Sequence, residues 1–528
     1  MFRSSFVSLF FCLLLAGAMT LADEPQLKVD PLLLAQAEEV WTIITKKDNP
    51  VWPGWNASDT PLLFYFPKVQ DVLVNHPKPP EGFRRYTGPV GMQGATIHVR
   101  DSKTFIDMDG QNTAITFAGV PTLVVADTLS NRRNNIRGML EGTRQSGKVT
   151  DPTFEQLSED AYGKLGMIAH EAFHVFQQKQ APKKVQGEAE LISYPTVSAA
   201  NALGFYLEGE LLAEAIKQRK TPSFREAVIR WLAVRLDRRA KLTPSSVTYE
   251  DKIEYLEGLA KYVEFRLLEV LEGQKPRAAM YYLQGFQGYD NLAPERDKLV
   301  RQMTRHMKGE ALVNNDPYGT APLRMRLYFS GMALGVLLDQ LSNNWKEQIF
   351  APERTLTDLI QSAIKPTEAE LADALKQVRS RPDYATLAAS KAEFEKAGHA
   401  AIKKAVEEIE TGPNTTLVVD YSALEKQPGF SYTTFGLQRV DENRTIYRMV
   451  PISVMWTGAS LRQTTPQPLL HDRAAKTLTF QLQEKLSAAA VGANPKEAQE
   501  LKLPGMTLSK CKWEATLKER TLVVRLLP

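Results

Sequence analysis

The chain is poor in cysteine, with two in 528 residues, Cys12 and Cys511. Cys12 lies in an N-terminal apolar stretch that we expect to be removed, so one thiol would remain in the mature chain. A lone thiol excludes an internal disulfide framework, and the fold must therefore be stabilised by core burial. Cys511 sits in an alternating, strand-like segment without an adjacent histidine, and we interpret it as structural.

The chain also lacks a strong excess of charge of either sign. It has 65 Lys and Arg against 61 Asp and Glu, a formal net charge of +4, and no basic run stands out. This balance gives no support for nucleic acid or an anionic membrane surface as a partner. The length exceeds that of one ordinary core, so several domains are expected.

One hydrophobic run stands out at the N-terminus, from Phe6 to Met19, and small Ala22 precedes acidic Asp23. The run is short for a membrane span, and these flanks are typical of a secretory signal peptide. We therefore expect residues 1–22 to be a cleaved leader and the mature chain to be exported, periplasmic or extracellular, without a stable membrane span. A retained N-terminal anchor is the alternative.

The remaining chain shows three kinds of pattern. Residues 23–150 begin with a helical segment and continue into strand-like segments, of which residues 121–126 are the clearest. Residues 151–412 have helical periodicity, and residues 413–528 alternate polar with apolar residues in short runs. We expect an α+β protein with a small mixed sheet, a large helical domain and a C-terminal β-rich domain.

The strongest chemical signal is His170-Glu171-Ala-Phe-His174, an H-E-x-x-H pattern. Residues four apart project from one face of a helix, so the two imidazoles can bind one zinc ion at about 2.0–2.1 Å. Glu171 lies about 100° round the helix, where it can take a proton from zinc-bound water. We therefore expect His170 and His174 as metal ligands and Glu171 as general base. A pair of helix histidines without a metal is the alternative.

The sequence around this motif favours a helix. Thr153 and Gln156 can form a capping box, and Pro182 marks the far end. The side predicted to be buried consists of four apolar residues: Leu165, Ala169, Phe173 and Phe176.

Zinc needs a third protein ligand. Gln177 and Gln180 stand where the extended form of the motif has a glycine and a third histidine, which excludes that subclass. The remaining route takes a glutamate from a later helix and leaves one position for water. Two segments compete, one carrying Glu208 and the other Glu257.

The segment Glu257-Gly-Leu-Ala-Lys-Tyr262 resembles the E-G-L-A-x-Y segment of gluzincin-type zinc peptidases of the peptidase MA group. With the motif at His170, the resemblance covers two short stretches of one catalytic domain. It implies a zincin-like core and Glu257 as third ligand. The gap of about 80 residues after His174 is longer than many gluzincins use, and their N-E-x-x-S-D form is absent, so Glu208 remains an alternative.

Two further acids lie on nearly the same helical face as Glu257. Glu254 and Glu264 could each hold a ligand imidazole by its other nitrogen, as such sites require. The alternative is that both are exposed acids paired with Lys252 or Lys261.

A donor for the developing oxyanion is also expected. The candidates are Tyr318, Tyr328 and His306. Related peptidases often use a Tyr or His after the third ligand, so the resemblance implies Tyr328, and a packing role is its alternative. The other histidines lack partners at ligand spacing, and we interpret them as surface or structural: His76, His98, His399 and His471.

The strand at residues 122–126 precedes the zinc helix, as the substrate-side edge strand does in gluzincin folds. If it has an open edge, an extended peptide could pair with it. We therefore expect residues 23–150 to carry the substrate-side sheet.

Together these patterns predict an exported zinc metallopeptidase that acts on a peptide or protein substrate. One alternative is a non-catalytic envelope binding protein on a peptidase-like scaffold. Another is a zinc hydrolase of a non-peptide amide bond, because the motif specifies the metal and the water and not the leaving group.

Overall fold

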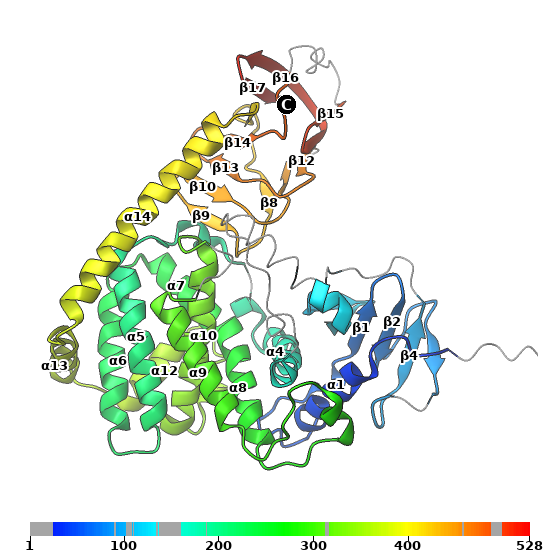
Figure 1. Cartoon of the computed structure of the whole chain (residues 1–528), viewed down its shortest axis with the longest axis vertical. Coiled ribbons are helices and arrows are strands. Elements are labelled where there is room, and N and C mark those ends of the chain that lie inside the picture. The colour runs from blue at the N-terminus through cyan, green and yellow to red at the C-terminus, as the bar shows by residue number, and fades with distance from the viewer. Residues whose placement is uncertain are drawn as a thin grey trace, which may run out of the picture. The chain divides into compact units, whose positions relative to one another are not determined.

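The computed structural model describes residues 25–88, 91–101, 108, 110–133, 136, 160–185, 187–311, 316–456, 459–486 and 499–528. The predicted leader and the predicted capping box at Thr153 lie outside these residues. No described helix combines the length and apolar composition that crossing a membrane requires. The chain divides into two compact units, which are described separately (Figure 1). Their bounds do not coincide with those of the expected domains.

The first unit contains a six-stranded mixed sheet with the order β3-β4-β2-β1-β6-β5. Strand β1 pairs parallel with β6, and the other neighbours are antiparallel. The bounds are β1 Leu62–Phe66, β2 Gln70–Val74, β3 Arg84–Tyr86, β4 Ile97–Arg100, β5 Thr113–Phe117 and β6 Val120–Ala126.

The expected edge strand is an inner strand. Residues 121–126 belong to β6, which is paired on both sides, so β6 cannot accept an added peptide strand. The reason is a two-residue hairpin turn in which Ala118 and Gly119 both have positive φ, 46° and 81°. Such a turn matches the twist of paired strands and places β5 outside β6. Among the described strands, β5 and β3 end the sheet.

Two helices complete the described core of this unit. Helix α1 (Pro31–Ile44) begins after Asp30, whose side chain accepts a hydrogen bond from the Leu32 backbone, with proline at the first position. Helix α4 (Ala161–Gln180) begins after Asp160, whose Oδ1 accepts from the Tyr162 backbone at 3.1 Å. The four residues predicted to form the buried side of α4 are all buried.

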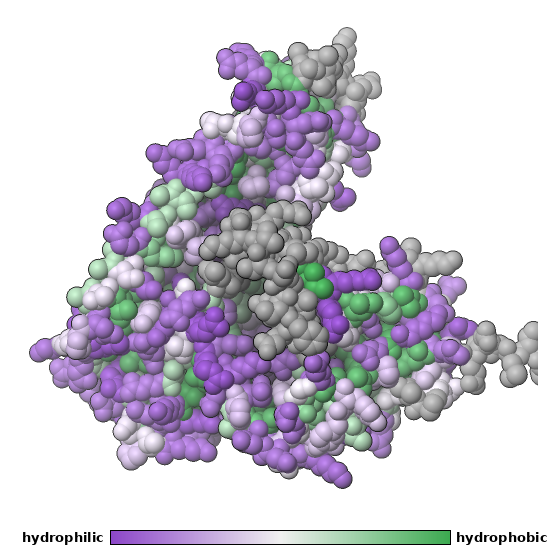
Figure 2. Space-filling view, viewed as in Figure 1, coloured by the Kyte–Doolittle hydropathy of each residue, from purple (hydrophilic) through white to green (hydrophobic). Residues whose placement is uncertain are grey.

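The second unit contains a helical part and a β-rich part, as expected from the sequence. Helix α10 is buried over most of its length, which is why its sequence is apolar on nearly all sides. Hydrophilic residues cover much of the visible face of the surrounding helices (Figure 2). The helices are α5 Ala199–Gln218, α6 Phe224–Arg239, α7 Pro244–Ile253, α8 Leu259–Leu271, α9 Ala293–Lys308, α10 Thr320–Leu341, α11 Trp345–Gln348, α12 Leu356–Ile364, α13 Glu368–Arg379 and α14 Tyr384–Thr411.

The β-rich part is an 11-stranded sheet against which α14 packs (Figure 1). The predicted final hairpin is present as β16 and β17, and Cys511 is buried on β16, consistent with a structural role. The strands are β7 Thr416–Asp420, β8 Gly429–Ser431, β9 Leu437–Arg439, β10 Arg444–Tyr447, β11 Ser453–Trp456, β12 Ala459–Gln463, β13 Leu469–Asp472, β14 Thr477–Gln481, β15 Gln499–Leu503, β16 Met506–Lys518 and β17 Thr521–Leu527.

Candidate metal centre

Helix α4 presents the two motif histidines one turn apart. The ring centroids of His170 and His174 are 4.8 Å apart and the ring planes are nearly perpendicular, at 85°. The helix is fixed by aromatic packing, because the Phe173 ring contacts the rings of Trp52 and Trp55 at centroid distances of 4.8 and 5.2 Å. The tryptophan-rich stretch of the sequence therefore supports the helix that carries the motif.

Glu257 lies in a π-turn, η4 (Glu254–Gly258), between α7 and α8. The backbone N–H of Leu259 bonds to the carbonyl of Glu254, five residues back, where an α-helix would bond four residues back. The neighbouring Gly258 allows α10 to approach closely, since a Cβ at this position would lie 2.6 Å from the Cα of Gly331. The glycine of the E-G-L-A segment is thus required by packing.

Gln177 anchors the end of α4 to this π-turn. The side chain is fully buried, and its Nε2 donates a hydrogen bond to the carbonyl of Tyr255 at 2.6 Å. Gln177 comes three residues after His174, and Tyr255 comes two residues before Glu257. The contact therefore fixes one end of the histidine helix beside the segment that carries Glu257.

The structure brings His170, His174 and Glu257 together. One ligand atom from each side chain lies within 4.8 Å of the other two, and the described residues hold no other such group of His, Cys, Asp or Glu. A zinc ion held by these three side chains would have ligand distances of about 2.0–2.2 Å. Two imidazoles and one carboxylate are a donor set that suits zinc.

Glu208, the alternative ligand, lies elsewhere. It is fully buried and both of its oxygens accept from arginines, one from Arg235 at 3.1 Å and the other from Arg238. It is not a member of the metal-binding cluster. The geometry therefore favours Glu257 as the third ligand, whereas Glu208 balances buried positive charge.

Neither interpretation of Glu254 is correct. It does not hold a ligand imidazole, and it is not an exposed acid paired with a lysine. It is buried and bonded to Arg235 and Ser330, with Arg239 at 3.4 Å. The π-turn is the physical reason. Its extra residue rotates Glu257 away from the helical face that it would otherwise share with Glu254.

Glu264 pairs with Lys261 at 2.6 Å, as the alternative interpretation expects, but its side chain is 12% exposed and is therefore not the exposed acid of that interpretation. The remaining lysine of that alternative, Lys252, pairs with Glu190 at 3.0 Å.

Arg324 of α10 holds the Glu257 carboxylate from the side. Its Nη2 donates to Glu257 Oε1 at 3.2 Å, while Nη1 bonds to Glu188 and lies 3.3 Å from the Tyr249 hydroxyl. The arginine is 3% exposed, so these partners replace its water. Arg324, Glu188 and Tyr249 were not expected from the sequence, because no local pattern connects positions so far apart in the chain.

The β-rich part also reaches this arginine. The ring of Phe435 lies 5.1 Å from the Arg324 guanidinium carbon, and the Thr320 hydroxyl, at the start of α10, donates to the Thr434 carbonyl at 2.7 Å. The loop before β9 is therefore packed against the helix that holds Glu257.

Tyr328 lies one turn after Arg324 on α10, with the guanidinium carbon 5.8 Å from its ring centroid. Burial and the negative charge of Glu257 raise the pKa of Tyr328 well above its ordinary value. The hydroxyl therefore keeps its proton at neutral pH and can act as a hydrogen-bond donor, as it does in its bond to Glu257.

The other two donor candidates lie in different surroundings. Tyr318 packs on Phe394 at 5.2 Å between ring centroids, and its carbonyl accepts from the Thr196 hydroxyl at 2.6 Å. His306 stacks on Phe329 at 5.0 Å, and burial, with nearby Arg305, lowers the pKa of His306 to about 4. These contacts favour packing roles for both.

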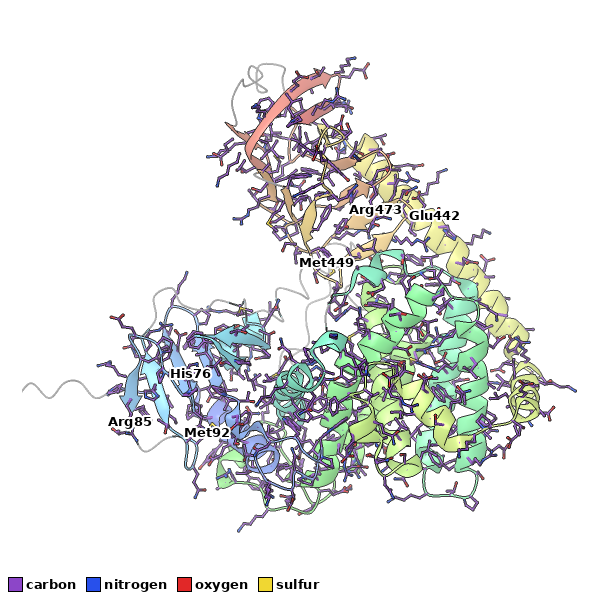
Figure 3. All side chains as sticks on the ribbon, turned by 180° about the vertical axis from the view of Figure 1, so that it is seen from behind. His76, Arg85, Met92, Glu442, Met449 and Arg473 are labelled. Atoms are coloured by element: carbon purple, nitrogen blue, oxygen red, sulfur yellow. The ribbon has the colours of Figure 1, made fainter. Side chains whose placement is uncertain are left out.

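Two of the remaining histidines have clear structural contacts. His76, labelled among the strands of the first unit in Figure 3, bonds to the Phe117 carbonyl at 3.2 Å and accepts from the Lys78 backbone at 3.2 Å. His471 bonds to the Tyr421 hydroxyl at 2.8 Å. Both agree with the interpretation as structural residues.

Comparisons of the chain with protein-family models, with curated proteins and with solved structures give no match. The resemblance to gluzincins therefore rests on the two short stretches around His170 and Glu257.

Proposed function

We propose that the protein is a zinc-dependent hydrolase in which His170, His174 and Glu257 hold the ion. The observation that carries the proposal is the convergence of these three ligand atoms within 4.8 Å. A His₂Glu set leaves one coordination position for water, which is the arrangement of a catalytic rather than a structural zinc site. Within this class, we propose an exported gluzincin-type metallopeptidase with a zincin-like core.

When bound, zinc would lower the pKa of a water molecule and polarise the scissile carbonyl. Glu171 follows His170 on α4, and it would accept a proton from the attacking water and deliver that proton to the leaving amine. Tyr328 donates a hydrogen bond to the carbonyl oxygen as negative charge develops there. Arg324 orients the Glu257 carboxylate through the contact at 3.2 Å.

The substrate class is supported by the gluzincin resemblance, and export is supported by the leader-like N-terminus. A zinc hydrolase of a non-peptide amide uses the same residues in the same roles. A non-catalytic binding protein is less favoured, because such a protein has no need for the base Glu171 beside both histidines.

The proposal is tested by metal content and hydrolysis in Glu171→Gln. We expect about one zinc per mature chain in the wild type and in the variant by mass spectrometry. Hydrolysis of a broad peptide library should fall by about 10²–10⁴-fold in the variant, since positioned bases contribute that much. Glu393→Gln, an exposed acid on α14, is the matched control and should keep full activity.

Unchanged cleavage in Glu171→Gln would exclude Glu171 as the base. A zinc-loaded wild type that cleaves no peptide in the library would favour the binding protein or the non-peptide hydrolase. A wild type without bound zinc after metal-replete purification would contradict the proposed class.

A further inference from the structure

The second unit contains a large cavity between α14, the β-strands and the loop before α10. Its volume is about 980 Å³, at the upper end of the range of about 300–1,000 Å³ for ligand sites. The lining includes Ala401 and Ala405 of α14, Tyr318 of the loop, and Gln438 and Met449 of the β-rich part. Figure 3 shows Met449 at the end of the β-strands that faces the helices.

Charges in the lining are paired. Arg448 lies 3.3 Å from Asp316, and Lys404 lies 3.7 Å from Glu408. With two cationic and two anionic side chains, the charged part of the lining has no net charge. Paired charges offer little attraction to phosphates, nucleic acid or strongly charged peptides.

The uncharged polar groups of the lining are mostly carboxamides. Gln438, Gln467, Gln481 and Gln483 all contribute. Gln438 is 2% exposed, and its Oε1 has no hydrogen-bond partner among the described residues; the same holds for Oε1 of Gln481. A buried acceptor without a partner costs about 1–3 kcal/mol, so a rotation of these carboxamides that brings the oxygens to a ligand in the cavity would be favourable.

Backbone strain is found in the same wall. Met449 has φ of +78°, a conformation that side chains other than glycine and asparagine rarely adopt. Strained residues of this kind cluster at ligand-binding sites, where the surrounding structure holds them in place.

We propose that this cavity binds an uncharged, extended segment of a polypeptide. Carboxamides offer both a donor and an acceptor, as peptide groups do, and Met449 with Pro466 and Pro468 offers apolar contacts for side chains. A sugar would need an open aromatic face. Tyr318 is the aromatic residue of the lining, and its ring is engaged by Phe394 at 5.2 Å.

The cavity is linked to the candidate metal centre through α10. Asp316 and Tyr318 precede the helix directly, while Arg324 and Tyr328 lie in its first turns. Eight residues from Thr320 to Tyr328 span about 12 Å at the rise of an α-helix. The cavity can therefore hold a distant part of a substrate that the metal centre cleaves, and naming a polypeptide as the ligand rests on the proposed function.

The experiment measures binding without catalysis, in full-length mature protein carrying Glu171→Gln. The probe is a fluorescein-labelled mixture of uncharged decapeptides made from Gly, Ser, Gln, Leu and Val, followed by fluorescence anisotropy. Ala401→Trp fills the cavity and should weaken binding about tenfold or more. Gln438→Leu removes the carboxamide without leaving a partner unpaired and should weaken binding about threefold to tenfold.

Two matched variants serve as controls. Ala400→Trp places the same ring on the exposed neighbouring position of α14, and Gln377→Leu removes an exposed carboxamide of α13. Both should bind the peptides with the same affinity as the protein that carries Glu171→Gln alone. Circular dichroism melting curves confirm that each variant is folded before its binding is compared.

Failure of this inference and failure of the proposed function give different results. Peptide binding that is absent in the parent, or that is equally affected by the controls, overturns the inference even if the wild type cleaves short peptides. Binding of chitohexaose or cellohexaose with the same dependence on Ala401 overturns the polypeptide assignment. Peptide binding that Ala401→Trp abolishes supports the inference even in a protein that holds no zinc.

Discussion

Glu257 and Glu208 show how two glutamates of the same unit lie in different surroundings. Glu257 is partly exposed beside the histidines and has Arg324 on one side, whereas Glu208 is enclosed by Arg235 and Arg238. In the first arrangement a carboxylate oxygen lies within 4.8 Å of a ligand atom of each histidine, whereas the second uses both oxygens on guanidinium groups. The two substitutions to glutamine should therefore have different effects.

We expect Glu257→Gln to lose most of its zinc while remaining folded, because the amide is a poor zinc ligand. Glu208→Gln should keep zinc but lower the free energy of unfolding by about 3–5 kcal/mol, since it leaves buried arginine charge uncompensated. Zinc content by mass spectrometry and denaturant unfolding measure the two effects. Zinc lost from folded Glu208→Gln and kept by Glu257→Gln would reverse the assignment.

The residues of the site could be predicted where the chemistry is local in sequence. The spacing of His170 and His174 predicts two candidate ligands from the helix period alone, and the E-G-L-A segment points to Glu257 by resemblance. Arg324 and Gln177 could not be predicted in this way. Their roles depend on partners from distant segments, Glu257 for the arginine and the Tyr255 carbonyl for the glutamine.

At the scale of elements, the crossing of α10 and the π-turn determines where Glu257 lies. A Cβ at Gly331 would lie 2.6 Å from the Glu254 carbonyl oxygen and 2.7 Å from the Gly258 Cα. Neither contact is with a flexible side chain, so the backbones themselves would have to separate. The fit at this crossing is therefore sensitive to a single methyl group.

We expect Gly331→Ala to lower the free energy of unfolding by about 1–3 kcal/mol, the usual cost of overpacking, and to weaken zinc binding. Gly163→Ala on α4 is the control, because its Cβ would meet Asp160 at 3.5 Å, an ordinary contact. That variant should be neutral or stabilised by up to about 1 kcal/mol, owing to better helix propensity. Denaturant unfolding and zinc titration of both variants provide the comparison, and equal behaviour would show that the crossing has no special role.

The sequence predicts the helical character of α4 and the final hairpin of β16 and β17, because each has a clear period and a turn signal. It does not predict that β6 is an inner strand, since strand order depends on which hairpin forms beside it. The π-turn is also missed. Its composition is that of an ordinary helix, and the Gln177 bond to Tyr255 and the approach of Gly331 are tertiary contacts.

For the whole molecule, one buried histidine, His471, and one partly buried histidine, His306, make stability depend on pH. Burial, with the positive charge of Arg305 and of Arg473 respectively, lowers the pKa of His306 and of His471 to about 4. In the unfolded chain both would titrate near about 6.5. Because the folded state takes up these protons later, the stabilisation is present above pH about 6.5 and is lost as the pH falls to about 4.

Denaturant unfolding between pH 7 and pH 4, with the metal removed by chelation, should show a loss of up to a few kcal/mol over this window. The double variant His306→Gln/His471→Gln should show a shallower pH dependence between pH 6.5 and 4. His399→Gln, an exposed histidine on α14, should leave the pH dependence unchanged. Parallel curves for the wild type and the double variant would assign the acid sensitivity to other groups.

The extra residue of the π-turn determines which side of the helix each downstream side chain faces. In an uninterrupted α-helix Glu250, Glu254 and Glu257, spaced by four and three residues, would form one acidic stripe along a single side. With the wide turn, Glu250 and Glu254 face Arg238 and Arg235, while Glu257 turns to Arg324. Removing one residue here would rotate the downstream helix by about 100° and turn Glu257 away from the position in which it could join a metal site. If the proposed function holds, a one-residue deletion at this point would therefore abolish hydrolysis while leaving the helices folded.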